Sequence, residues 1–263
     1  MSQVFIVGGL DVAELVFYLF FLFFLGLVIY LRREDRREGY PLEEEDTGRL
    51  LETDSPLQRA PQKSFLLRHG KGLFVPEARA NRDPQEIPGT RRSPWPGSPL
   101  EPVGDPLTAG VGPGAFQAAR DDEPETDREG RPKIVPLGLA PGFRIVEGEP
   151  DPRGWPVYGT DGKVAGTVSD IWVDTADHLV RYLAVRLPDD PADALPVLLP
   201  ITMATVRRDR GVVESDSLPA AAFARAPRPK SPTQVTRREE DRITGFFGAG
   251  YLYGSPEKVE PWL

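Results

Sequence analysis

Cysteine is absent from this chain of 263 residues, and histidine occurs only twice. Without cysteine the chain forms no disulfide, no thiolate nucleophile and no cysteine-ligated metal site. His69 and His178 lie more than a hundred residues apart, which disfavours a histidine-based metal or catalytic site. Glycine-rich nucleotide-binding loops and the G-x-S-x-G nucleophile motif are missing as well. These absences predict a chain that is not an enzyme and holds no cofactor or metal of its own.

An excess of positive charge is also lacking. Lys and Arg total 32 against 40 Asp and Glu, so the net charge is −8. Binding to nucleic acid needs clustered basic residues that neutralise phosphates, so nucleic acid is not an expected partner. Proline and glycine are abundant, with 29 and 26 residues, and they predict many turns and extended connections.

One long apolar run stands near the start of the chain. Residues 12–31, VAELVFYLFFLFFLGLVIYL, are 20 residues with a single charge, Glu14. A helix of that length spans about 30 Å, the thickness of a bilayer core. A signal peptide is the alternative, but residues 1–11 hold no Lys or Arg, and large charged residues follow the run. We therefore predict a retained transmembrane helix over residues 12–31.

The charged exit from this helix reads LRREDRREGYPLEEED, residues 31–46. Four arginines follow the helix and none precedes it, so the positive-inside rule places the C-terminal bulk in the cytoplasm. Topology and lipid contact explain the arginines, whereas the interleaved Glu34, Asp35 and Glu38 favour a surface matched to protein partners. The expected membrane and partner contacts are Tyr30, Arg32, Arg33, Arg36, Arg37 and Tyr40.

Residues 32–114 combine this exit with an extended arm that is rich in proline and glycine. Twelve of the 74 residues from 41 to 114 are proline, which is typical of disorder or of an arm that docks on another protein. Two short strands, 64–67 and 72–75, are predicted around an RHGKG turn. A charged, mostly acidic loop follows within residues 115–141.

Residues 142–218 carry strand signals separated by turns. β-branched and aromatic residues are concentrated in six short segments, 142–148, 155–159, 163–174, 179–187, 194–201 and 211–216. This pattern predicts a small antiparallel barrel or sandwich. In residues 180–187 the alternation gives one apolar face and one mixed face.

The last part, residues 219–263, holds a predicted helix over 231–253. Ser231 or Thr233 is expected to cap it, with Pro232 in the first turn and the glycines of 248–250 at its end. The fold class is therefore a single N-terminal transmembrane helix followed by a mainly-β domain with one late helix.

Carboxylates gather in three places along the chain. They are Asp170, Asp174 and Asp177 on a strand and its exit, Glu123, Glu125 and Asp127 in the acidic loop, and Glu239, Glu240 and Asp241 in the late helix. Most acidic clusters are solvated faces, and proton relay is the functional alternative.

Several motifs, in order, resemble the H subunit of purple-bacterial photosynthetic reaction centres. They are YLRREDRREGYPLE, VGDPLTAGVGPGAF, KIVPL, EGEPDPRGWPV, AGTVSDIWVD, VRYLAVRL and SPTQVTRREEDRITGFFGAGYLY. The resemblance implies a PRC-type barrel and a non-pigment-binding subunit that caps the cytoplasmic face of the L and M subunits. It also implies an inner photosynthetic membrane, with residues 1–11 in the periplasm.

The resemblance further implies a role in delivering protons to the reduced secondary quinone. Asp174 and Asp177 match the family's acidic residues near the quinone site, and Asp177 stands where Glu is common. Further proton-transfer candidates are Glu125, Asp127, Glu129, Lys133, Arg181 and Glu240. Some family members carry histidines in the loop before KIVPL, whereas this chain has Glu129 and Arg131 there, so proton uptake is expected to use carboxylates.

The implied cofactors, which are bacteriochlorophyll, bacteriopheophytin, quinones, carotenoid and non-haem iron, belong to L and M. The implied partners are L and M, a cytochrome subunit, a light-harvesting antenna and membrane lipids. A membrane-anchored scaffold or assembly adaptor, whose barrel binds other proteins without electron transfer, is the alternative interpretation.

Overall fold

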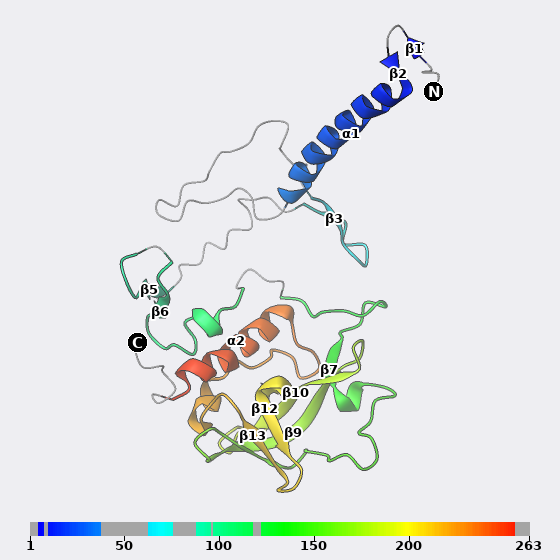
Figure 1. Ribbon diagram of the computed structural model, residues 1–263. Helices are drawn as coiled ribbons and strands as arrows, with labels where there is room; N and C mark the ends of the chain where they lie inside the picture. Colours follow the sequence, from blue (N-terminus) through cyan, green and yellow to red (C-terminus); the bar gives the residue numbers. More distant parts are fainter. Residues whose placement is uncertain are drawn as a thin grey trace. The chain divides into compact units, whose positions relative to one another are not determined.

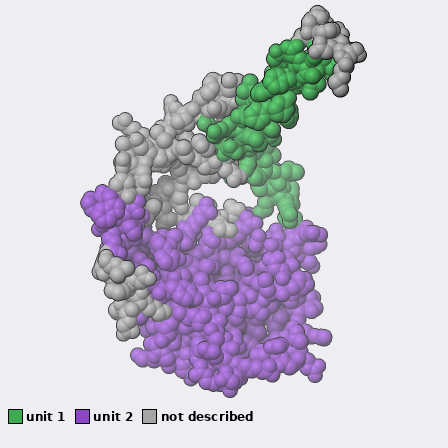
Figure 2. Space-filling model, viewed as in Figure 1, with its two compact units in different colours: residues 1–81 green, residues 82–263 purple. Residues whose placement is uncertain are grey.

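The computed structural model describes residues 5–7, 10–37, 63–75, 88–95, 97–117 and 122–255. The chain divides into two compact units, residues 1–81 and 82–263, coloured green and purple in Figure 2. The first unit contains one long helix and short strand pairs, and the second contains the β-sheet and the late helix (Figure 1).

The long helix of the first unit is α1, Val12–Asp35. The carboxylate of Asp11 caps it by accepting the backbone N–H of Glu14 at 2.8 Å, which satisfies one of the free donors of the first turn. Within the described residues α1 is the one helix long and apolar enough to cross a membrane, and none of its side chains is buried by the chain itself. The predicted helix is thus confirmed and runs four residues further, to Asp35.

Two short strand pairs accompany α1 in the first unit. β1, Phe5–Val7, pairs with β2, Leu10–Asp11, directly before the helix. β3, Phe65–Leu66, and β4, Leu73–Phe74, form the predicted antiparallel hairpin. Its turn contains Gly70 and Gly72 at positive φ, a conformation that glycine adopts without steric cost.

The second unit is built on one seven-stranded sheet. Its strands are β7 (Ile134–Pro136), β8 (Pro156–Tyr158), β9 (Val164–Asp174), β10 (Leu179–Arg186), β11 (Val197–Pro200), β12 (Ala204–Arg207) and β13 (Val212–Ser215). The order is β11-β10-β9-β8-β13-β12, and β7 pairs with β9 off this path. All pairings are antiparallel except β8 with β13, which is parallel. Among the described residues the strand path does not close on itself, so the mainly-β domain is confirmed while closure into a barrel is not.

Smaller elements complete this unit. A strand pair, β5 (Gly89–Arg91) with β6 (Leu100–Pro102), precedes the sheet. Short 3-10 helices lie in the connections, η2 (Gly112–Gly114), η3 (Leu137–Leu139), η4 (Ile201–Met203) and η5 (Ala220–Arg225).

The centre of β10 is buried on both of its faces. Tyr182, Leu183, Ala184 and Val185 are each at most 4% exposed. All four belong to the hydrophobic core, to which α2, Arg237–Tyr253, contributes Ile243, Phe246 and Phe247. The face of β10 that is mixed in the sequence is therefore buried at its middle as well.

One predicted strand is wrong, and two strands of the sheet were not predicted. Residues 142–148 form no strand, although Phe143 and Ile145 are half-buried against the core while Arg144 and Val146 are exposed. The alternation of apolar and exposed residues in this segment reflects side-chain packing against the core and not pairing of the backbone with another strand. The strands that were not predicted, β7 and β12, are three and four residues long, too short to show a period.

The predicted start and end of the late helix are also wrong. The N-cap is Thr236, whose hydroxyl accepts the N–H of Glu239 at 3.2 Å, while the Glu239 carboxylate accepts the N–H of Thr236 at 2.9 Å. This reciprocal capping box fixes the first turn. The glycines of 248–250 do not end the helix, which continues to Tyr253. Two glycines of the helix instead allow η2 to pack closely against it. A Cβ at Gly245 would lie 2.9 Å from the carbonyl oxygen of Gly114, and one at Gly248 equally close to that of Pro113.

Candidate functional site

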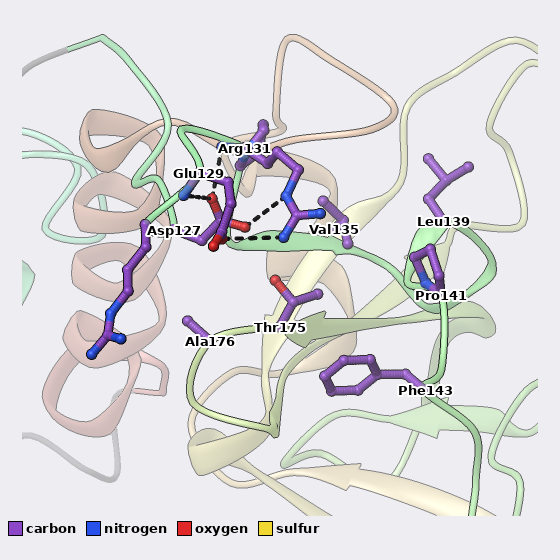
Figure 3. A pocket seen from close by; sticks show the side chains of 11 residues that line it. Asp127, Glu129, Arg131, Val135, Leu139, Pro141, Phe143, Thr175 and Ala176 are labelled. Atoms are coloured by element: carbon purple, nitrogen blue, oxygen red, sulfur yellow. Dashed lines mark hydrogen bonds and ion pairs between the residues drawn. The ribbon is translucent and has the colours of Figure 1, made fainter. Parts of the chain in front are cut away.

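Several of the predicted carboxylates lie on the segments around the end of β9, between β7 and β10. Asp174, the last residue of β9, lies opposite Ile134 of β7 and Leu179 of β10. The acidic loop runs directly into β7, so its residues reach the same edge of the sheet as the turn between β9 and β10. Figure 3 shows this loop beside Thr175 and Ala176 of that turn.

Asp174 is the buried carboxylate of the site. It is 1% exposed, and its Oδ1 accepts the backbone N–H groups of Ala176 and Asp177, both at 2.9 Å. Its Oδ2 makes no hydrogen bond with any described residue. A buried carboxylate oxygen without a donor is rare and costly, and such groups are found where a side chain has a functional role.

Asp177 lies in the same turn but faces solvent. Its backbone N–H donates to Asp174, and its own carboxylate makes no hydrogen bond or ion pair with the described residues. The neighbouring His178 has a positive φ of 56°, and its ring lies against that of Phe143 at 5.1 Å between centroids. The structure therefore joins Asp174 and Asp177 through one turn and gives them opposite environments.

Asp127 fixes the shape of the acidic loop. Its carboxylate accepts the backbone N–H groups of Glu129 and Arg131, each at 2.9 Å, and the Nε–H of Arg131 at 2.8 Å. These donors, with the backbone N–H of Arg131 first, hold the pKa of Asp127 below its usual value. Glu129 is exposed and pairs with Arg131 at 3.3 Å. Asp127 thus clamps the loop, and its lowered pKa favours the ionised form, while Glu129 is exposed and Glu125 partly exposed to solvent.

Lys133 connects the loop to the turn after β9. Its Nζ lies 3.5 Å from a carboxylate oxygen of Glu125, and its carbonyl accepts both the backbone N–H and the hydroxyl of Thr175, at 2.9 and 3.1 Å. Sequence reasoning missed Thr175. Its only signal is a hydroxyl residue placed directly after Asp174.

Glu240 belongs to a second charged group, on β10 and α2. Its Oε2 lies 3.7 Å from a guanidinium nitrogen of Arg181 and accepts the hydroxyl of Tyr182 at 3.4 Å. Burial raises the pKa of Tyr182, and the negative charge of Glu240 raises it further. Tyr182 was also missed, because in the sequence it is indistinguishable from an ordinary strand residue.

A second set of contacts holds the acidic loop against the start of α2. The carboxylate of Asp122 accepts the hydroxyl of Thr236 at 3.0 Å and pairs with Lys230 at 2.5 Å. The backbone N–H of Arg237 donates to the carbonyl of Glu123 at 3.0 Å. The loop is therefore fixed at both ends, to α2 and to the sheet.

An open pocket of about 680 Å³ separates the loop from the turn after β9. Asp127, Glu129 and Arg131 line one wall, and Thr175, Ala176 and Phe143 line the other (Figure 3). Within the described part of the chain, no three Asp, Glu or His side chains converge as a metal site requires. The arrangement offers carboxylates that can exchange protons with solvent.

The predicted membrane contacts lie at the end of α1. Tyr30, Arg32 and Arg33 are exposed on the helix. Arg36 caps its end, and Arg37 pairs with Glu34 at 2.5 Å, so an interleaved acid neutralises part of the basic exit. Tyr40 lies outside the described residues.

Two protein-family models match this chain. Residues 147–218 match the PRC-barrel domain, which defines the class of the sheet. Residues 4–139 match the photosynthetic reaction centre H-chain N-terminal region, a match that covers more than half of the chain. The chain therefore belongs to the photosynthetic reaction centre H-chain family, as its motifs predicted. The family implies an accessory subunit that associates with the reaction centre L and M subunits, and the apolar α1 fits a membrane anchor.

Proposed function

We propose that this chain caps the cytoplasmic face of the L and M subunits, stabilises the secondary quinone site and delivers protons to the reduced quinone. The observation that carries the proposal is Asp174, a buried carboxylate with one oxygen that accepts nothing from the described residues. It lies at the edge of the sheet where surface carboxylates gather.

The need for such a residue follows from the quinone chemistry. Reduction to quinol takes up two protons, and a quinone beneath a protein cap receives them only through groups that bind and release protons. Proton transfer requires donor and acceptor within about 3 Å or joined through one water. A carboxylate can serve as such a group, because it accepts a proton when ionised and donates one when protonated.

The charges around Asp174 divide into uptake and positioning roles. Glu129, Glu125 and Asp177 face solvent at least in part and take up protons from the cytoplasm. Asp127 shapes the loop through its hydrogen bonds to Glu129 and Arg131, and the donors that lower its pKa favour its ionised form, from which it can accept a proton. Lys133 and Arg181 bring positive charge that favours ionised carboxylates nearby.

The remaining assignments follow from the same proposal. Bacteriochlorophyll, bacteriopheophytin, quinones, carotenoid and non-haem iron are held by L and M. Arg32, Arg33, Arg36 and Arg37 place the end of α1 at the cytoplasmic side of the inner membrane, with residues 1–11 in the periplasm. A cytochrome subunit and a light-harvesting antenna complete the wider assembly.

The test is the variant Asp174→Asn in the assembled reaction centre. The amide keeps the size of the side chain and its acceptor for Ala176 and Asp177 but cannot carry a proton. We expect proton-coupled transfer of the second electron to the quinone to slow by about 10-fold or more at neutral pH, within the range for a positioned acid–base group. Asp177→Asn should slow the same step without blocking assembly.

The matched control is Asp193→Asn, an exposed aspartate in the connection between β10 and β11. It should leave the second electron transfer unchanged. Wild-type kinetics in Asp174→Asn between pH 6 and pH 9, in complexes with normal quinone occupancy, would contradict the proton-delivery role. Membership in the reaction centre complex is unaffected by that outcome.

A further inference from the structure

The β3–β4 hairpin has no part in the proton path, yet its composition is unusual for an exposed segment. In residues 63–75, KSFLLRHGKGLFV, six positions are large apolar residues and every charged residue is basic. The chain as a whole has a net charge of −8, so this is a local reversal of sign. The backbone N–H of Leu67 donates to the carbonyl of Gly72 at 2.8 Å and closes the turn.

Both faces of the hairpin are apolar. Phe65 stands directly opposite Phe74, and Leu66 stands opposite Leu73. Because neighbouring residues on a strand point to opposite faces, the phenylalanines lie on one face and the leucines on the other. Phe65 and Phe74 are 46% and 45% exposed, and Leu66 and Leu73 are 83% and 64% exposed. A protein surface that packs against one face leaves the other in water, whereas immersion in an apolar layer covers both.

The basic residues flank the apolar part at its two ends. Lys63 precedes β3, and Arg68 and Lys71 lie in the turn. Long basic side chains in such positions keep their charges in a polar layer while their stems cover apolar surface. Each Lys or Arg near an anionic membrane surface contributes roughly 1 kcal/mol to binding.

We propose that the β3–β4 hairpin inserts shallowly into an anionic lipid bilayer surface, with Phe65, Leu66, Leu73 and Phe74 among the upper acyl chains and the basic residues at the headgroups. Insertion is shallow because a two-stranded ribbon leaves backbone N–H and C=O groups along both edges, which need water or headgroups as partners. The 25 residues between Arg37 and Lys63 span up to about 85 Å when extended, so the tether to α1 allows this position. The hairpin then forms a second membrane contact beside the transmembrane helix.

The absence of cysteine provides a direct assay. A single cysteine introduced by Leu66→Cys in the full chain carries a spin label at the most exposed apolar position of the hairpin. The chain is reconstituted into vesicles of phosphatidylcholine alone or of equal parts phosphatidylcholine and phosphatidylglycerol. Collisions of the label with oxygen and with a water-soluble nickel chelate report its depth. The matched control is Val146→Cys, an equally apolar position that is 68% exposed in the β-domain.

With phosphatidylglycerol present, the label at position 66 should become accessible to oxygen and protected from nickel, whereas the label at position 146 stays in water. Lys63→Gln, Arg68→Gln and Lys71→Gln together should lower the inserted-to-free ratio about 100-fold, the loss expected for three basic residues. Equal depth in both vesicle types would overturn the recognition of anionic lipid. Protection that arises only when L and M are added, whatever the lipid charge, would assign the hairpin to a protein surface instead.

Discussion

Thr236 is the residue on which the junction between the acidic loop and α2 depends, so Thr236→Ala is the most informative stability variant. The substitution removes the hydroxyl that accepts the N–H of Glu239 at 3.2 Å and donates to Asp122 at 3.0 Å. Loss of an N-cap costs about 1 kcal/mol. The bond to Asp122 adds at most about 1 kcal/mol, because Asp122 is a third exposed and keeps its ion pair with Lys230.

We therefore expect Thr236→Ala to lower the free energy of unfolding by about 2 kcal/mol, and the melting temperature by about 4–8 °C. The assay is urea unfolding of the full chain in detergent, followed by the intrinsic fluorescence of its four tryptophans, of which Trp172 is 2% exposed in the core. The control is Thr233→Ala, whose hydroxyl, among the described residues, hydrogen-bonds with Ser231 alone in the turn before the helix. A loss for Thr233→Ala as large as that for Thr236→Ala would refute the capping box.

Two further predictions concern the acidic loop. The pKa of Asp127 is lowered by folding, so its contribution to stability is present above the ordinary aspartate pKa of about 3.9 and is lost as the pH falls through the lower folded value. Asp127→Asn should therefore remove part of the acid dependence of urea unfolding, and an unchanged dependence between pH 5 and pH 2 would contradict the clamp. Zinc should not slow proton uptake through residues 125–133, because this loop has no histidine and both oxygens of Asp127 already accept hydrogen bonds. Inhibition that disappears in Glu129→Gln would show that the loop binds zinc.

Much of the fold follows from local pattern. The apolar run over 12–31 and the apolar segments around the RHGKG turn identify α1 and the β3–β4 hairpin, because each is defined by neighbouring residues. β9 and β10 are long enough to show strand composition. These elements need no distant contact to be recognised.

Most of the errors concern features of the late helix that involve residues distant in the sequence. The helix begins at Arg237, not near Ser231, because Thr236 and Glu239 form the capping box and Asp122, more than a hundred residues away, accepts the Thr236 hydroxyl. The glycines of 248–250 were interpreted as the end of the helix. In the structure, Gly245 and Gly248 lie inside the helix, where the close approach of η2 leaves no room for a side chain. The capping box fits the local pattern T-R-R-E at 236–239 and was overlooked, whereas the contacts with Asp122 and with η2 cannot be read from nearby residues.

The candidate site divides in the same way. Motif resemblance identified Asp174 and Asp177 together, but only the structure separates the buried carboxylate from the exposed one. Thr175 and Tyr182 were missed because their roles depend on Lys133 and Glu240, which are distant in sequence. The sequence around a hydroxyl residue in a strand or turn does not indicate which distant residue it will hydrogen-bond to.

The central claim is that this chain works inside a light-driven reaction centre. The most direct test is a near-infrared spectrum of the complex isolated from mildly solubilised native membranes through a tag on this chain. Bands of bacteriochlorophyll and bacteriopheophytin that bleach on illumination are the predicted result. A colourless isolate from phototrophically grown cells, with the chain intact, would contradict the account and favour a membrane-anchored scaffold.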